Sequence, residues 1–264
     1  MTEWSASAYN HISTLQQVMA EKEIRRLELA GGERILDVGC GDGKVTAEIA
    51  DLVPRGSVLG IDPSHNMIDF ASRHFGTAQR PNLRFEVADA RRLPYRSEFD
   101  LVVSFNALHW VQEQEDALRC MRAALKPGGR ALLRFVPREA GWAIEYIIEE
   151  VRLRKRWAGF FTGFRPPFAH FTPAQYREMA ERSGWLVDHI LVENGSWDFQ
   201  SGEAFAAFCG ATFVEWNRKV PEADRPAFIA DVLDHYRAAA CHRPGEENVF
   251  KFQQMEVALT RPTD

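Results

Sequence analysis

Three glycines at alternate positions and two aspartates are the residues whose types and spacing favour nucleoside binding. Gly39, Gly41 and Gly43 lie in the stretch ILDVGCGDG, where the chain must turn sharply and a ligand can approach the backbone. Asp62 and Asp89 each follow a short apolar run. A carboxylate after the second such run is placed to accept hydrogen bonds from both hydroxyls of a ribose.

The glycine spacing distinguishes this turn from other nucleotide-binding motifs. The dinucleotide fingerprint GxGxxG needs its third glycine where Lys44 stands, and no GK[ST] is present to complete a P-loop. The spacing is GxGxG, with Asp37 two residues before the first glycine. Asp89 is placed to accept a hydrogen bond from an adenine amino group. Together these residues predict a nucleoside without a pyrophosphate.

Alternating strands and helices must position these side chains. Apolar runs predict strands at Ile35–Val38, Ser57–Ile61, Leu83–Val87, Phe99–Phe105, Arg130–Val136, Trp185–Val192 and Val249–Thr260. Helical spacing or capping predicts helices at Lys44–Leu52, Ser64–His74, Glu115–Leu125 and Trp142–Trp157, from Thr172, and at Gly202–Arg218 and Asp224–Ala240. Lys126–Gly129 is predicted as a turn, and Ala158–Phe171 as a loop. Because helical crossovers join successive strands, the predicted fold is α/β: a doubly wound, mostly parallel seven-stranded sheet with helical insertions after strands 5 and 6.

Three regions follow from this pattern. Residues 1–30 are predicted as an N-terminal segment that becomes an amphipathic helix from Leu15 to Leu29, and it is either a lid or a frayed terminus. Residues 31–137 form the predicted cofactor-binding core. Residues 138–264 complete the sheet and add helical insertions that cap the substrate.

Composition excludes several classes of function. The net charge of -5 gives no reason to expect nucleic-acid binding. Four cysteines lie far apart without a CxxC pair, and no His/Cys cluster has the spacing of metal ligands, so no metal is predicted. No apolar run approaches the roughly 20 residues that span a bilayer. With no secretory leader visible, a reduced, cytoplasmic protein is expected. Nothing in the sequence indicates an oligomeric state.

Five segments in order over residues 33–136 resemble the class I S-adenosylmethionine-dependent methyltransferases, which have a Rossmann-like fold. They include DVGCGDG, GIDPSHNMI, ADARRLPYRSEFDLVVSFNALHWV and LKPGGRALLRF. The resemblance implies S-adenosylmethionine as cofactor and a role for each matched position. Gly39 and Gly41 would let the methionine moiety approach the backbone, and Asp37 would support the turn. Asp62 would hold the ribose, and Pro63 and Met67 would line the adenine pocket. Asp89 and Ala90 would bind the adenine edge, and Phe105 and Asn106 would border the sulfonium.

The layout of the second half is similar to trans-aconitate methyltransferases and to juvenile hormone acid methyltransferases. The similarity lies in an aromatic N-terminal segment, the His109–Trp110 pair and helices inserted before the last strand. It implies methyl esters of small carboxylic acids as products. It also implies an N-terminal glutamine at the methyl site, for which Gln16 and Gln17 are the nearest matches.

The acceptor determines which further side chains are needed. A carboxylate arrives ionised and needs no base, whereas a hydroxyl or amine acceptor needs one, for which His109 is the best-placed candidate. Arg134 and Arg165 are candidates for binding a carboxylate, with Tyr9 and Trp110 as further substrate contacts. His109 and Trp110 could equally be packing residues. The aromatic residues Trp157, Phe160, Phe161, Phe164 and Phe168 either pack the inserted helices or line an apolar pocket.

The predicted function is methyl transfer to a small molecule, with a carboxylic acid as the first choice. O-, N- or C-methylation of a natural product or of a carrier-bound acceptor is an alternative. A second alternative is a non-catalytic, cofactor-binding partner of another methyltransferase.

Overall fold

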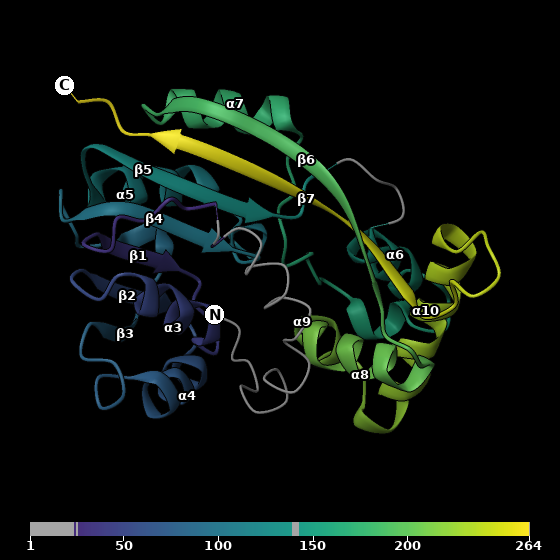
Figure 1. The fold of residues 1–264 in the computed structure, drawn as a ribbon. Helices are drawn as coiled ribbons and strands as arrows, with labels where there is room; N and C mark the ends of the chain where they lie inside the picture. The colour runs from purple at the N-terminus through teal and green to yellow at the C-terminus, as the bar shows by residue number, and fades with distance from the viewer. Residues whose placement is uncertain (1–23, 25, 139–142, 264) are drawn as a thin grey trace. The chain divides into compact units, whose positions relative to one another are not determined.

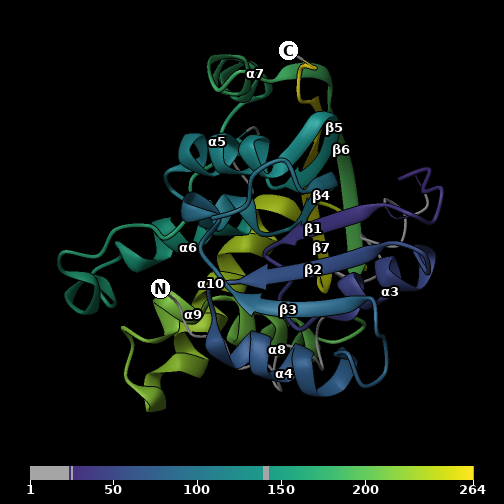
Figure 2. The ribbon, with the colours of Figure 1, turned by 90° about the vertical axis from the view of Figure 1, so that its left-hand side faces the viewer.

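One seven-stranded sheet organises the chain in the computed structural model, which describes residues 24, 26–138 and 143–263. Its strands are β1 (Arg34–Val38), β2 (Ser57–Asp62), β3 (Leu83–Val87), β4 (Phe99–Phe105), β5 (Leu125–Phe135), β6 (Leu186–Asp198) and β7 (Val249–Thr260). Their order is β3-β2-β1-β4-β5-β7-β6. The first five pair in parallel, and β7 runs antiparallel to β5 (Figure 1). Figure 2 shows β1, β2 and β3 side by side with arrowheads at the same end. The predicted fold class is confirmed.

Both faces of the central strands are buried, as expected of a parallel sheet with crossover helices. The α-helices of the same compact unit are α3 (Lys44–Leu52), α4 (His65–Phe75), α5 (Gln114–Ala124) and α7 (Pro173–Arg182). Ile35 and Val103 share one apolar cluster with α3, whereas Leu36 and Val102 share another with α5 and α7. Because neighbouring residues of a strand point to opposite faces, this division explains why the adjacent residues Ile35 and Leu36 are both apolar.

The chain divides into two compact units. The core unit comprises the described residues up to Pro137, Phe168–Val192 and those from Gln254. The helical unit comprises the described part of Arg138–Pro167 together with Glu193–Gln253. It contains α6 (Ile144–Arg152), η3 (Ala158–Phe161), α8 (Gly202–Thr212), α9 (Val214–Asn217), η4 (Glu222–Asp224) and α10 (Arg225–Ala240). These elements are the helical insertions predicted after strands 5 and 6.

Aromatic side chains hold the helical unit together. The Trp157 indole nitrogen donates a 2.7 Å hydrogen bond to Asp231 Oδ2, and its ring meets Phe228 edge-on at 5.2 Å. The Trp216 indole donates to Glu149 Oε1, also at 2.7 Å. Both tryptophans are fully buried with their only polar atom satisfied. For Trp157, the packing alternative is therefore the one that the structure supports.

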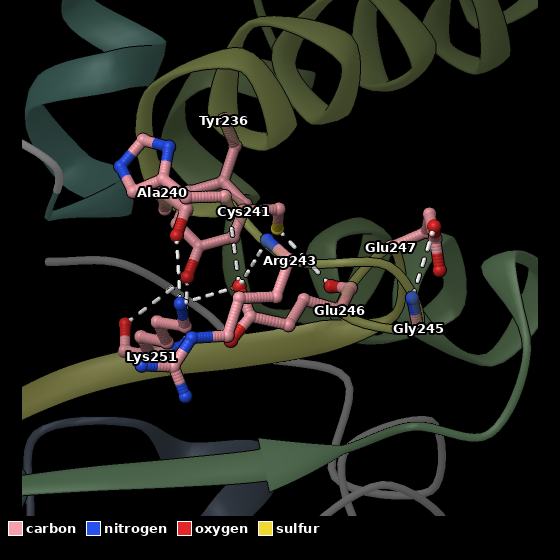
Figure 3. Close-up of polar contacts among 9 residues, drawn as sticks. Tyr236, Ala240, Cys241, Arg243, Gly245, Glu246, Glu247 and Lys251 are labelled. Atoms are coloured by element: carbon pink, nitrogen blue, oxygen red, sulfur yellow. Dashed lines mark hydrogen bonds and ion pairs between the residues drawn. The ribbon is translucent and has the colours of Figure 1, made fainter.

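A polar cluster joins the end of α10 to the start of β7 (Figure 3). Lys251 Nζ donates to the Ala240 carbonyl and to Glu246 Oε2, both at 2.8 Å. A cation at a helix C-terminus complements the unsatisfied carbonyls there. The hydrogen bond from Lys251 lowers the pKa of Glu246 to about 2. The Tyr236 hydroxyl accepts a hydrogen bond from the Lys251 backbone N–H, so two elements of the helical unit meet at one lysine.

The bounds of several predicted elements are wrong. The helix expected over Trp142–Trp157 ends at Arg152, and the expected loop Ala158–Phe171 begins with the short helix η3. Of the helix predicted over Leu15–Leu29, residues 26–29 are not helical, and Glu28 has a left-handed φ of +47°. The part of this prediction that covers residues 15–23 and 25 lies outside the described residues. The helix expected over Gly202–Arg218 breaks at Phe213, where the Thr212 hydroxyl donates to the Phe208 carbonyl and competes with the helix backbone. The sixth strand continues to Asp198, with Gly195 accommodating the Phe252 ring where a Cβ would lie 2.3 Å away. The fifth strand already begins at Leu125 and includes the predicted turn.

Candidate active site

The glycine turn leaves β1 in a left-handed conformation that only glycine adopts freely. Gly39, Gly41 and Gly43 have φ values of +81°, +55° and +84°. The Gly39 and Cys40 backbone N–H groups both donate to the Ile61 carbonyl, at 2.7 and 3.0 Å, which ties the turn to the end of β2. A Cβ on Gly41 would meet none of the described residues within 4 Å, so with respect to them this side of the backbone is open to a ligand.

Asp62 connects the end of β2 to the glycine turn. Its Oδ2 accepts from the Gly41 N–H at 3.2 Å, and its Oδ1 accepts from the Ser64 N–H at 2.9 Å. Ser64 caps α4 by accepting from the Met67 N–H. Met67 is buried, and Pro63 is half-buried beside the cap. The structure therefore brings Asp62, the turn and the predicted adenine-lining residues together at one edge of the sheet.

Asp37 is buried beneath the turn. Its Oδ2 accepts a 2.7 Å hydrogen bond from the Thr46 hydroxyl on α3. Burial raises the pKa of Asp37 to about 7, with a smaller contribution from the negative charge of Asp62. At 2 % exposure, this carboxyl joins β1 to α3 and fits the predicted supporting role better than direct contact with a ligand.

Asp89 lies after β3, beside the carboxyl end of β2. The Asp62 carbonyl accepts from the Ala88 N–H at 3.1 Å, which fixes this neighbourhood. Asp89 caps the short helix η1 (Ala90–Arg92) and forms a forked ion pair with Arg91, with a shortest distance of 2.6 Å. The side chain of Arg91 lowers the pKa of Asp89. Arg91 also pairs with Glu113 at 2.6 Å.

Arg91 pairs with a predicted site residue, Asp89, and the sequence alone does not indicate this pairing. The available signal is an arginine two residues after an aspartate that caps a turn, which is too common to indicate a role by itself. Ala90, which is predicted to contact the adenine edge, is buried at the first position of η1.

The chain reverses after β4 at the predicted sulfonium-bordering residues. Phe105 ends the strand half-buried, and Asn106 has a left-handed φ of +57°. Asn106 donates its backbone N–H to the Arg134 carbonyl at 2.7 Å. The next residue, Ala107, packs directly against Gly39 of the glycine turn. Glu28, Ser97 and Gln200 also have a left-handed φ, and asparagine adopts this conformation more readily than most residues, so the conformation alone does not test the predicted role of Asn106.

His109 and Trp110 lie in the short helix η2 (Leu108–Trp110). His109 is 4 % exposed, and its ring lies 4.9 Å from that of Trp110 and 6.0 Å from that of His170. Burial, with a smaller contribution from His170, holds the pKa of His109 well below its usual value. Among the described residues, His109 Nδ1 has no hydrogen-bond partner. This imidazole is therefore neutral near pH 7, and no carboxylate of the described residues pairs with it to increase its basicity.

The remaining predicted contacts lie in different places. Arg134 is buried, and its Nη1 is 3.6 Å from Glu256 Oε2, so its charge already has a carboxylate partner. Glu256 also pairs with Arg26 and His189. Arg165 is exposed in the helical unit. Tyr9, Gln16 and Gln17 lie outside the described residues.

Metal sites and membrane spans are absent from the described part of the chain. Within it, no group of three or more His, Cys, Asp or Glu side chains has the arrangement of a metal site. None of the helices formed by residues 24, 26–138 and 143–263 is long and apolar enough to cross a membrane.

The residues at this edge fit the predicted nucleoside. An open glycine backbone, an acidic side chain at the end of β2 and a second one after β3 match an amino-acid moiety, a ribose and an adenine, respectively. Ser104, at the end of β4, is buried and donates its hydroxyl to the Val38 carbonyl, so β1 and β4 are locked together just below the turn.

Comparison with known proteins agrees with this geometry. Residues 35–129 match the family model described as a methyltransferase domain. The chain is 30% identical over 237 residues to the trans-aconitate 2-methyltransferase of Deinococcus radiodurans, covering 87% of either chain. It is 33% identical over 207 residues to the juvenile hormone acid O-methyltransferase of Drosophila melanogaster, covering 72% of this chain and 68% of the relative.

The fold is also similar to that of solved structures. The crystal structure of the YcgJ protein from Bacillus subtilis superimposes with a TM-score of 0.65 at 20% identity. The superposition covers 93% of this chain and 99% of that protein.

Proposed function

Because the chain belongs to the class I S-adenosylmethionine-dependent methyltransferases, we propose that it methylates the carboxylate of a small carboxylic acid. The names of two relatives, a trans-aconitate 2-methyltransferase and a juvenile hormone acid O-methyltransferase, support an acid as the acceptor. The two named acids share a carboxylate and little else. The proposal therefore concerns the reacting group and leaves the rest of the acceptor open.

S-adenosylmethionine supplies, when bound, a methyl group activated by a positively charged sulfur. The chain's own residues bind and orient: Asp62 would hold the ribose, Asp89 the adenine edge, and the open backbone at Gly41 the amino-acid moiety. Phe105 and Asn106 would border the reacting carbon. Alignment and exclusion of water provide most of the rate enhancement in such a displacement.

The proposal of a carboxylate as the methyl acceptor depends mainly on one observation, which is that His109 is buried and neutral. A hydroxyl or amine acceptor has to lose a proton, and a base for this task works best with a pKa near the working pH. His109 is buried and has a lowered pKa, and the contacts of the described residues include no carboxylate on its ring. It is a weak base. A carboxylate acceptor has no proton to lose, so this arrangement suits it.

Several residues remain proposed contacts for the acceptor. They are Tyr9, Gln16, Gln17, Trp110 and Arg165, with His109 as a neutral hydrogen-bonding group. Arg134 fits this role less well, because Glu256 already pairs with its guanidinium.

The test is a methylation assay with matched acceptors. The protein is incubated with S-adenosylmethionine and either trans-aconitic acid or a long-chain unsaturated fatty acid, alongside the amide, alcohol and amine analogues of each. Mass spectrometry measures the methylated product and S-adenosylhomocysteine. Methyl esters from acids alone support the proposal. Methylation of an alcohol or amine but of no acid contradicts it. Cofactor binding without turnover on any acceptor would favour the non-catalytic partner instead.

A further inference from the structure

A buried glutamine ties two segments of the core unit together. Gln114, the first residue of α5, is 1 % exposed. Its Nε2 donates to the Leu108 carbonyl at 2.7 Å and to the Ala169 carbonyl at 3.1 Å. The orientation of the amide is unambiguous, because the flipped form would place its oxygen against two carbonyl oxygens. The two amide protons of this side chain are thus donated to two backbone carbonyls that lie 61 residues apart in sequence.

The two tied segments have different origins. Leu108 begins η2, the turn after β4 that carries His109 and Trp110. Ala169 lies just after the point where the chain passes from the helical unit back into the core unit, between Pro167 and Phe168. Gln114 therefore links the start of η2, which carries His109 and Trp110, to the segment through which the chain returns from the helical unit to the core unit.

Three more contacts make this link specific. The Ala169 backbone N–H donates to the His109 carbonyl at 2.8 Å, so residue 169 is held on both of its backbone polar groups. The rings of His109 and His170 lie 6.0 Å apart. The His170 ring in turn stacks on Phe168 at 4.5 Å. The segment 168–170 is thus held by its backbone and lies against the His109 ring.

We infer that Gln114 is a positioning residue, which fixes the His109–Trp110 turn through the segment that follows the helical unit. A buried side chain that donates to two backbone carbonyls can hold a non-repetitive turn in one conformation. Without Gln114, the Leu108 carbonyl would keep only its hydrogen bond from the Val111 N–H, and the half-buried Ala169 carbonyl would lose the amide that it accepts from. Gln114 itself contacts neither reactant. Gln114 would act on the reaction indirectly, by fixing the conformation of η2.

Hydrogen exchange monitored by mass spectrometry tests this role without an acceptor. Gln114→Glu retains the shape and at most one donor, and Gln114→Met retains the length with no donor. Both variants should speed exchange of the backbone amides in 108–111 and 169–172 by about tenfold, the scale of losing one or two hydrogen bonds. Exchange in β2 and α3, and the affinity for S-adenosylhomocysteine by calorimetry, should stay within about twofold of wild type.

Gln175→Glu is the matched control. Gln175 is exposed, and its Oε1 accepts from the Thr172 N–H in the capping box of α7, a role that a glutamate also performs. This variant should leave exchange in both segments unchanged. Unaltered exchange in the two Gln114 variants would overturn the inference. So would equally faster exchange throughout the sheet, since Gln114 would then serve only general stability.

A kinetic measurement extends the test, and this part rests on the proposed function. With an acid that the wild type methylates, Gln114→Glu should lower kcat/KM for the acid by on the order of 10- to 100-fold, as expected of a small misplacement at the reacting groups. A kcat/KM within twofold of wild type would overturn the inference. If the wild type methylates no acid, the proposed function fails, and the exchange experiment still decides the role of Gln114.

Discussion

A Cβ atom on Gly39 would lie 2.1 Å from the Cβ atom of Ala107, so the glycine turn and the turn after β4 touch with no space for another carbon. Gly39 also has a φ of +81°. Two independent constraints, one steric and one conformational, therefore require glycine at this position. The contact sets the distance between the two turns that are expected to hold the cofactor.

Gly39→Ala should destabilise the fold and weaken binding of S-adenosylhomocysteine. The clash contributes about 1–3 kcal/mol and the left-handed backbone about 1–2 kcal/mol. Chemical denaturation measures the first effect and calorimetry the second. Gly39→Ala/Ala107→Gly should recover the steric part alone. Gly41→Ala is the control for conformation, because its Cβ would meet no atom of the residues that the structure describes. Equal destabilisation by both single variants would refute the steric argument.

Asp62→Asn should fold normally and bind S-adenosylhomocysteine on the order of 100-fold more weakly, because charge-assisted hydrogen bonds to two ribose hydroxyls are lost. Asparagine is preferable to alanine, since the carboxylate also accepts from the Gly41 and Ser64 N–H groups. Calorimetry measures the affinity and circular dichroism checks the fold. Unchanged affinity would remove Asp62 from the site.

The raised pKa of Asp37 predicts that the free energy of unfolding depends on pH. Its pKa rises from an ordinary value near 3.8 to about 7 on folding, so ionisation opposes the folded state. Its contribution to stability is fully present below about pH 4 and is lost as the pH rises to about 7. Asp37→Asn keeps an acceptor for the Thr46 hydroxyl and removes this dependence. The free energy of unfolding of the variant relative to wild type should therefore increase between pH 4 and 8, by at most about 4 kcal/mol. A constant difference would contradict the assignment.

Arg91→Ala should weaken binding of S-adenosylhomocysteine by about three- to tenfold, because the Asp89 carboxylate loses its forked partner and becomes free to turn. Arg92→Ala is the matched control, since Arg92 is the exposed neighbour. Calorimetry of both variants gives the comparison. Similar losses in the two variants would mean that the overall positive charge matters and the geometry does not.

His109→Gln distinguishes a base from a neutral side chain. A general base contributes at least about 100-fold to turnover. Because burial keeps His109 neutral, we expect a loss below about tenfold with the proposed carboxylate acceptor. The pH profile of kcat for the wild type should show no inflection between pH 6 and 8 from this residue. A loss of 100-fold or more, together with such an inflection, would make His109 the base and favour a hydroxyl or amine acceptor.

The strands and the place of the glycine turn at the end of β1 were predictable from the sequence because local patterns determine them. The short, mostly apolar run Ile35–Val38 is typical of an interior strand, and the glycines that follow it indicate a turn at the carboxyl edge of the sheet. The break at Phe213 was not predictable, since it depends on hydrogen bonds from Thr212 and Asn217 to nearby carbonyls within an otherwise apolar helical pattern.

The residues with which the candidate site residues pair were also not predictable from the sequence. The pairing of Arg134 with Glu256 requires β7 to lie antiparallel beside β5, which places these residues opposite each other across 122 positions of sequence. The link from Gln114 to Ala169 depends on a loop for which the sequence predicts no fixed conformation. Long-range register, and not residue type, decides both.

The chain crosses between the core unit and the helical unit four times, near residues 137, 167, 192 and 253. No continuous fragment of the gene therefore encodes either unit. Deleting everything after residue 137 would remove the helical unit but also α7, β6 and β7. Exchange of the helical unit with that of a relative, to make a hybrid enzyme, requires two segments to be replaced together. A single-crossover chimaera would combine halves of two unmatched units.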